Sequence, residues 1–208
     1  SRALVAEGIE VDLPHLGGKR AATWFPISWV IYSVYLSEKI GYWRYILMDR
    51  HLKANPGEAF APLFDFFEPW CQDENRHGDC FTVMMRCWPG ITGGFRGKLL
   101  SRFFLWSVFL THTLTVCERG DFYELLGIEP KEFDEEVIKR TNHTAKNAFP
   151  WVFNFEDGRF LEMRVEIIKA FRKFMEAKGL QKISKLTTFV GLIFRQFALP
   201  MEETNAIR

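Results

Sequence analysis

The sequence predicts an all-α fold, and three observations support this prediction. Apolar residues recur every three or four positions over long stretches, which is the period of a helix with one buried face. Alternation of apolar and polar residues, which would indicate strands, never lasts longer than a few positions. Helix-ending signals, Asn-Pro-Gly at 55–57 and Trp-Pro-Gly at 88–90, separate the periodic stretches. There is no internal repeat, so we expect residues 1–208 to form a single helical domain.

The composition excludes one class of function. The chain has 208 residues, of which 48% are hydrophobic and 16% aromatic, so it is long enough to bury a sizeable core. Its 27 basic and 26 acidic residues leave a net charge of +1, which argues against a nucleic-acid partner, because phosphate binding needs a basic excess. The cysteines lack C-x-x-C spacing and are expected to be reduced thiols: Cys71, Cys80, Cys87 and Cys117.

The first helix is expected from Pro26 to His51. Residues 1–23 contain an apolar run followed by a proline and two glycines, and we interpret them as the remnant of an upstream element. The chain starts without Met, so we expect it to be the C-terminal portion of a longer protein. The helix has an apolar stripe that only Glu38 interrupts; its apolar members are Ile27, Ile31, Val34, Gly41, Tyr45 and Met48.

The stretch 60–88 is expected to form the second helix, which starts or kinks near Pro69. Its apolar stripe contains Glu74 and His77, whose i, i+3 spacing places both side chains on one helix face. A carboxylate buried without a partner costs on the order of several kcal/mol, so its charge must be compensated. A metal ion, or a basic or hydrogen-bonding neighbour, would do so.

Two readings of these polar residues remain open. One acid on the first helix and a Glu-x-x-His pair on the next are half of the ligand set of carboxylate-bridged di-iron four-helix bundles. The alternative is a core Glu in a salt bridge and a hydrogen-bonded core His. Asp73 and Arg76 flank the pair, and either could orient His77 or a carboxylate. Their alternative role is that of solvent-facing charges.

The second half of the chain predicts four further helices, at 98–117, 130–148, 157–178 and 180–199. The apolar run 103–117 is shorter than the about 20 residues that span a bilayer, so a buried core helix is expected there. His112 on this helix could approach the site, although such a residue more often hydrogen-bonds a neighbour.

The C-terminal tail, residues 180–208, combines apolar residues with Lys182 and Lys185. Such a helix can face anionic lipid or a partner, or pack on the core with its basic face in water.

The sequence resembles a known family in two specific stretches, YLSEKIGYWRY at 35–45 and WCQDENRHGD at 70–79. Both are similar to the aerobic oxidative cyclases of chlorophyll and bacteriochlorophyll synthesis, the magnesium-protoporphyrin IX monomethyl ester cyclases. Further similarity lies in KLLSRFFLWSVF at 98–109 and FYELLGIEP at 122–130. The resemblance implies a ferritin-like helical bundle, partial here, with extra C-terminal amphipathic helices. It also implies O₂-dependent formation of the isocyclic ring, which gives divinyl protochlorophyllide.

The resemblance implies that Glu38, Glu74 and His77 are metal ligands of a di-iron cofactor. It further implies a Mg-porphyrin substrate and an electron donor such as ferredoxin. We therefore expect a peripheral protein on the cytoplasmic side of a photosynthetic membrane, without a transmembrane helix.

The chain departs from the family mainly in its ligand set, and Pro69 and the stretch 80–88 are also atypical. The family's upstream Glu and its first Glu-x-x-His motif have no counterpart before Glu38, because neither Glu7 nor Glu10 has a His three residues on. Three hypotheses follow. The chain is part of an active oxidative cyclase, or it is a catalytically inactive, cyclase-derived structural or assembly subunit of a photosynthetic membrane complex. In the third, a homodimer builds the di-iron site at its two-fold axis.

Overall fold

The computed structural model describes residues 25–59 and 62–205, so the expected upstream remnant, residues 1–23, lies outside the described residues. Most of the described chain is helical. In chain order the elements are α3 (Ile27–Ala54), η1 (Pro56–Glu58), η2 (Pro62–Phe66), α4 (Phe67–Cys87), α5 (Pro89–Thr92), α6 (Gly94–Glu118), α7 (Gly120–Leu125), α8 (Pro130–Ala145), β1 (Trp151–Phe153), α9 (Arg159–Glu176), α10 (Leu180–Phe197) and β2 (Met201–Glu203). The prediction of an all-α class is confirmed.

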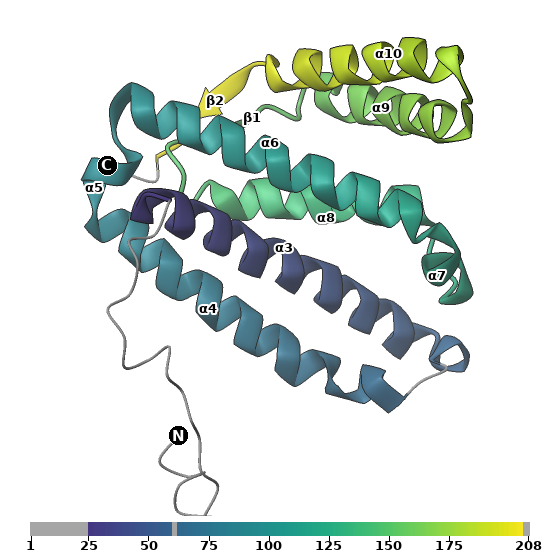
Figure 1. Cartoon of the computed structure of the whole chain (residues 1–208). Helices are drawn as coiled ribbons and strands as arrows, with labels where there is room; N and C mark the ends of the chain where they lie inside the picture. Colours follow the sequence, from purple (N-terminus) through teal and green to yellow (C-terminus); the bar gives the residue numbers. More distant parts are fainter. Residues whose placement is uncertain (1–24, 60–61, 206–208) are drawn as a thin grey trace, which may run out of the picture.

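The long helices form a layered bundle (Figure 1). Helix α4 packs on α3, which in turn packs on α6 and α8. On the other side of α6, α9 and α10 form a hairpin that Figure 1 shows at the top of the molecule. Helix α4 begins at Phe67, which places Pro69 in the first turn, where a missing amide donor is tolerated. The expected start near Pro69 therefore agrees with the structure.

Aromatic side chains fill the centre of the bundle. Tyr32 and Tyr35 of α3 are fully buried, and their ring centroids lie 4.7 and 5.2 Å from that of Phe149. The Tyr35 hydroxyl donates a hydrogen bond to the carbonyl oxygen of Thr144 at 3.2 Å, and Trp43 Nε1 donates to the Thr144 hydroxyl at 2.8 Å. These rings satisfy their polar atoms while burying large apolar surfaces, which explains where much of the high aromatic content lies.

Helix α6 is the central helix of the bundle. It is 25 residues long, and of the described helices it alone is long and apolar enough to cross a membrane. However, it contacts α3, α8, α9, α10 and β1, and its buried residues include the polar Ser101 and His112. The expectation that it is too short to span a bilayer is thus wrong, because it counted only the run 103–117, whereas the apolar helix is 25 residues long. The expectation of a core helix agrees with this packing.

A small antiparallel sheet was not predicted. Strand β1 pairs with β2 in the register Trp151 opposite Glu203, and the Asn142 side chain donates a hydrogen bond to the Phe153 carbonyl at 2.8 Å. Each strand has three residues, which is too short to produce a visible alternation in sequence. The sheet joins the end of α8 to the end of α10 and so closes the bundle.

Candidate metal centre

Helices α3 and α4 bring Glu38 and His77 together. Glu38 Oε2 lies 3.3 Å from Nδ1 of His77, across the contact between the two helices. The Glu38 side chain is 20% exposed, whereas that of His77 is 57% exposed. The carboxylate is therefore partly withdrawn from water, and the imidazole is accessible from outside the described bundle.

Glu74 is the second carboxylate of the site. Burial raises its pKa, and the hydrogen bond and negative charge of Glu38 raise it further, while a hydrogen bond from Trp70 and the nearby His77 act in the opposite direction. Two carboxyl groups this close repel one another unless a proton or a cation lies between them. Either a shared proton or a cation would relieve this repulsion between Glu38 and Glu74.

The backbone of α3 makes room for Glu74 at Gly41. A Cβ atom at Gly41 would lie 3.5 Å from Oε2 of Glu74, which is van der Waals contact. Any side chain larger than alanine would occupy the space that the carboxylate uses. Gly41 thus belongs to the local geometry that sets Glu74 opposite Glu38.

Lys39 is a residue of this region that sequence reasoning missed. Its side chain is buried on α3, and Nζ donates hydrogen bonds to Asp79 Oδ1 at 2.5 Å and to Asn75 Oδ1 at 2.9 Å. The stem of Lys39 crosses α4 at Gly78, where a Cβ atom would lie only 2.6 Å from its Cε. This contact fixes the position of α4 on α3 next to Glu38. The signal in the sequence is the glycine one residue after His77.

The structure corrects two expectations about α4. Of the apolar positions that steps of three and four from Glu74 select, Phe67, Cys71, Gly78 and Met85 are buried, whereas Trp70, Met84 and Trp88 are 44–45% exposed. Spacing by three and four residues includes two adjacent faces of a helix, and only one of them meets α3.

The second correction concerns the neighbours of the motif. Asp73 and Arg76 lie 3.9 Å from each other, with side chains 63% and 74% exposed, so neither orients His77. Asp73 and Arg76 are therefore solvent-facing charges, which was the alternative role expected for them from the sequence.

His112 does not approach this site. Its Nδ1 lies 2.7 Å from Asp134 Oδ1, and Asp134 also accepts hydrogen bonds from Thr113 and Arg164. All four side chains are buried between α6, α8 and α9. His112 therefore has the structural role that its position in a core helix favoured.

The candidate ligands fit one half of a metal site. Carboxylate oxygens and an imidazole nitrogen are ligands that iron accepts, and Glu38, Glu74 and His77 face one another. Among the residues that the structure describes, however, no group of three or more His, Cys, Asp or Glu side chains lies close enough to hold a metal ion. Further ligands would have to meet the exposed face of α4 that carries His77.

Fold and site together define a class of protein: a ferritin-like helical bundle that presents one Glu and one Glu-x-x-His pair from neighbouring helices. The rubrerythrin family model matches residues 2–85, the part of the chain that includes α3 and most of α4. No solved structure matches the chain.

The chain is similar to several proteins named as oxidative cyclases. The whole chain is 75% identical to the magnesium-protoporphyrin IX monomethyl ester (oxidative) cyclase of Prochlorococcus marinus (strain MIT 9313). It is 51% identical to cyclase 1 of Nostoc sp. (strain PCC 7120) and 46% identical to cyclase 2 of Thermosynechococcus vestitus, over 96% of the chain in both cases. The chain spans 59–60% of the length of these curated relatives. Its resemblance to the oxidative cyclases is thus confirmed.

Proposed function

We propose that this chain contributes to an oxidative cyclase that acts on magnesium-protoporphyrin IX monomethyl ester, forming the isocyclic ring with O₂ to give divinyl protochlorophyllide. The observation that carries the proposal is the pairing of Glu38 with His77 at 3.3 Å, beside a Glu74 carboxyl whose pKa is raised. Identity of 75% over the whole chain to a protein of that name supports the choice of substrate.

In this proposal Glu38, Glu74 and His77 hold one side of a di-iron cofactor. When bound, that cofactor would supply the oxidising power for the reaction with O₂. The protein's part is to neutralise the metal charge with two carboxylates and to fix one coordination position with the His77 imidazole. Trp70 supports this arrangement, because its side chain hydrogen-bonds Glu74 and its ring stacks on Tyr45 at 5.3 Å.

Substitution of the ligands tests the proposal. We expect Glu74→Ala and His77→Ala each to lower bound iron and to abolish conversion of magnesium-protoporphyrin IX monomethyl ester, because each removes a ligand. Iron content and product formation are measured on the purified protein as it occurs in its host. Arg76→Ala is the matched control, since Arg76 is exposed on the same helix turn. Wild-type turnover in either ligand variant would refute the assignment.

A structural or assembly subunit is the second candidate function. It is favoured by the apolar surface that α4 leaves open, which includes Trp70, Met84 and Trp88. A homodimer that joins two such faces would also bring together two sets of ligands. The iron content separates these cases: about two ions per chain fits the proposed enzyme, about one per chain fits the dimer, and none fits the structural subunit.

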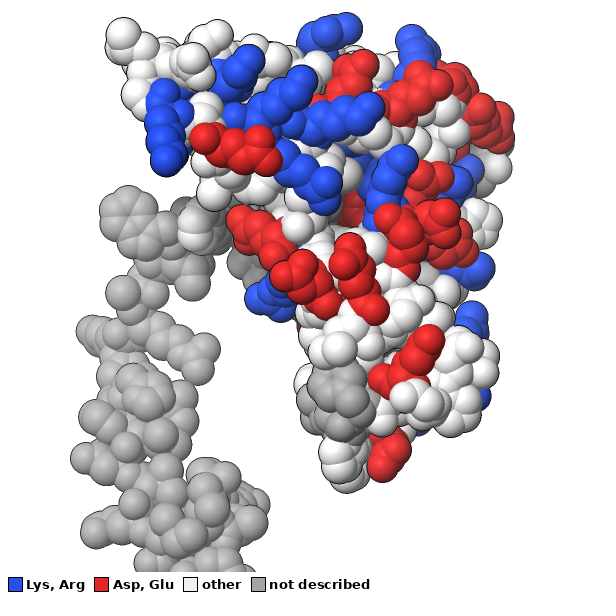
Figure 2. All heavy atoms as spheres, turned by 90° about the vertical axis from the view of Figure 1, so that its right-hand side faces the viewer, with Lys and Arg blue, Asp and Glu red and all other residues white. Residues whose placement is uncertain are grey.

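We also propose a peripheral position on the cytoplasmic side of a photosynthetic membrane, with electrons delivered by a donor such as ferredoxin. The support for membrane contact is helix α10, which exposes Leu180, Ile183 and Phe194. Figure 2 shows Lys and Arg side chains in the upper part of the face formed by the ends of the helices, near the α9–α10 hairpin, where they are mixed with Asp and Glu. Co-sedimentation with anionic vesicles tests the proposal, and binding should fall at least about tenfold in Ile183→Ser/Phe194→Ser.

A further inference from the structure

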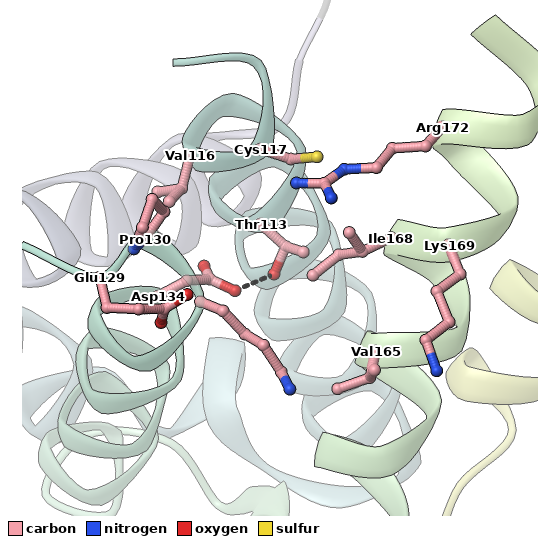
Figure 3. Close-up of a pocket in the computed structure, with 11 residues that line it drawn as sticks. Thr113, Val116, Cys117, Glu129, Pro130, Asp134, Val165, Ile168, Lys169 and Arg172 are labelled. Atoms are coloured by element: carbon pink, nitrogen blue, oxygen red, sulfur yellow. Dashed lines mark hydrogen bonds between the residues drawn. The ribbon is translucent and has the colours of Figure 1, made fainter. Parts of the chain in front are cut away.

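A cavity of about 200 Å³ lies between α6, the start of α8 and the middle of α9 (Figure 3). Val116 of α6 and Val165 and Ile168 of α9 contribute apolar walls. The volume corresponds to that of about seven water molecules in the liquid, which is room for a small organic molecule. It does not involve Glu38, Glu74 or His77.

The polar lining of the cavity is Asp134 and Thr113, which Figure 3 joins by a dashed line. Asp134 accepts hydrogen bonds from the Thr113 hydroxyl at 2.8 Å and from Arg164 Nη1 at 2.5 Å, and it faces His112 Nδ1 at 2.7 Å. Its charge is thereby compensated by the fully buried guanidinium of Arg164. A bound anion would therefore not meet a free carboxylate here.

The mouth of the cavity carries Lys131, Lys169 and Arg172. Within the described part of the chain, none of these three forms an ion pair or a side-chain hydrogen bond. Glu129 also lines the cavity, but its carboxylate is engaged by the backbone N–H of Glu132 at 2.6 Å. That neutral donor leaves the charge of Glu129 in place, but three cations stand against it, so the lining has an excess of positive charge above apolar walls.

We propose that this cavity binds a small organic carboxylate with a short aliphatic body. The carboxylate lies at the mouth, where Arg172 can bind it in a bidentate manner and the two lysines add charge. The aliphatic body lies between Val116, Val165 and Ile168, where it is removed from water. The ligand needs both its carboxylate and its aliphatic body to bind well. An inorganic anion would leave the apolar walls uncovered, and a neutral molecule would leave the three cations unpaired.

Methyl NMR titration of the protein with hexanoate tests the proposal. We expect saturable shifts of the Val116, Val165 and Ile168 methyl signals with a Kd on the order of 1 mM, as is reasonable for a ligand of this size. Hexanol and inorganic phosphate, titrated in parallel, should each bind at least about tenfold more weakly. Absence of saturable shifts, or equal binding of hexanol or phosphate, would overturn the proposal.

Two variants of α9 distinguish this site from general surface charge. Lys169→Gln/Arg172→Gln should weaken hexanoate binding by about tenfold or more, whereas Lys173→Gln should leave it unchanged, because Lys173 is also basic but does not line the cavity. Both variants change exposed residues and are expected to fold. Equal weakening by Lys173→Gln would show that the attraction is only that of the basic helix surface, and the proposed site would then be wrong.

Discussion

Glu74 is the residue at which stability and the proposed chemistry oppose each other. Without a cation its carboxylate lies beside that of Glu38, and both burial and that neighbour raise its pKa. Glu74→Gln keeps the shape of the side chain and removes the repulsion. We expect the free energy of unfolding of the metal-free protein to rise by a few tenths to about 1 kcal/mol, since solvent screens a partly exposed pair. Chemical denaturation of both proteins measures this difference.

The same variant should lose any stabilisation by ferrous iron, because ligand binding stabilises only a protein that retains the site. Unfolding of wild type and Glu74→Gln is compared with and without ferrous ion under anaerobic conditions. Glu162→Gln, an exposed carboxylate on α9, is the control and should behave as wild type in both conditions. Equal stabilisation of Glu74→Gln and wild type by iron would contradict the role of Glu74.

At the residue scale, helical spacing was enough to select Glu38, Glu74 and His77, and the structure brings them together. Spacing could not reveal that His77 is 57% exposed, because it identifies a face of a helix but not whether a partner covers it. Lys39 was missed for a similar reason. A lysine in an amphipathic helix is normally assigned to the surface, and only the packing against Gly78 shows that it is buried.

At the element scale, the contact of Lys39 with Gly78 holds α3 and α4 in position. Gly78→Ala places a methyl group about 2.6 Å from the Lys39 stem, so the buried lysine must move. We expect a loss of about 1–3 kcal/mol of stability. In a Lys39→Ala background the same substitution should be neutral or slightly stabilising, because alanine is the better helix former. A double-mutant cycle by urea unfolding measures the coupling, and additive effects would contradict the contact.

Helices α8 and α9 are joined by charged groups, of which Glu135 gives a pH-dependent signal. A hydrogen bond from Lys139 lowers the pKa of Glu135 below its ordinary value of 4.5, burial opposes this effect, and the Lys139 and Arg164 charges add to it. For a lowered carboxyl pKa, the stabilisation is present above the unfolded value and is lost as the pH falls through the folded value. Glu135 should therefore contribute stability at neutral pH that is lost as the pH falls from the ordinary carboxyl pKa of 4.5 through the lowered pKa of the folded protein.

Urea unfolding between about pH 6 and pH 3 tests this dependence. Glu135→Gln should be less stable than wild type at pH 6, and the two should converge toward pH 3. Glu132→Gln is the matched control, because Glu132 is exposed on the same helix and forms no ion pair within the described residues. A constant difference between Glu135→Gln and wild type at all pH values would show that the ion pairs of Glu135 are not its cause.

Element positions were predictable where strong local signals exist. The proline in the first turn of α4 and the Asn-Pro-Gly after α3 gave boundaries close to those observed. The start of α6 was placed too late because Gly93 and Gly94 indicate a break, whereas in the structure Gly94 is already the first residue of the helix. Tertiary packing against α5 and β1 outweighs the helix propensity of glycine there.

At the scale of the whole molecule, the fold class followed from the period of the apolar residues, since a chain with no sustained alternation has few alternatives to a helical bundle. How the helices divide between two buried clusters did not follow from the sequence. The main core extends from Ile31 to Phe160, whereas a second, small cluster of buried residues, Ile167, Ala170 and Phe189, holds the α9–α10 hairpin. Sequence periodicity gives the apolar face of each helix but not the cluster to which that face belongs.

The separation of the small α9–α10 cluster from the main core predicts which part of the molecule unfolds locally most easily. Residues 180–188 of α10 are all exposed, whereas its other end is anchored to α6, where Arg102 Nη1 donates hydrogen bonds to the carbonyl oxygens of Phe197 and Leu199 at 2.5 and 2.7 Å. Native-state hydrogen exchange should therefore show a lower opening free energy for 180–188 than for α3 or the centre of α6, because few buried contacts must be broken.

The anchor itself can be removed by Arg102→Met, which keeps most of the side-chain volume. We expect exchange to accelerate along all of α10 by a factor that corresponds to about 1.5–3 kcal/mol, the usual contribution of hydrogen bonds to a charged group, while α3 and α4 retain their protection. Gln181→Ala, at the exposed end of α10, should leave the exchange rates near Phe197 unchanged. Core-like protection of 180–188, or acceleration of α3 together with α10 in Arg102→Met, would mean that the hairpin and the bundle open as one unit.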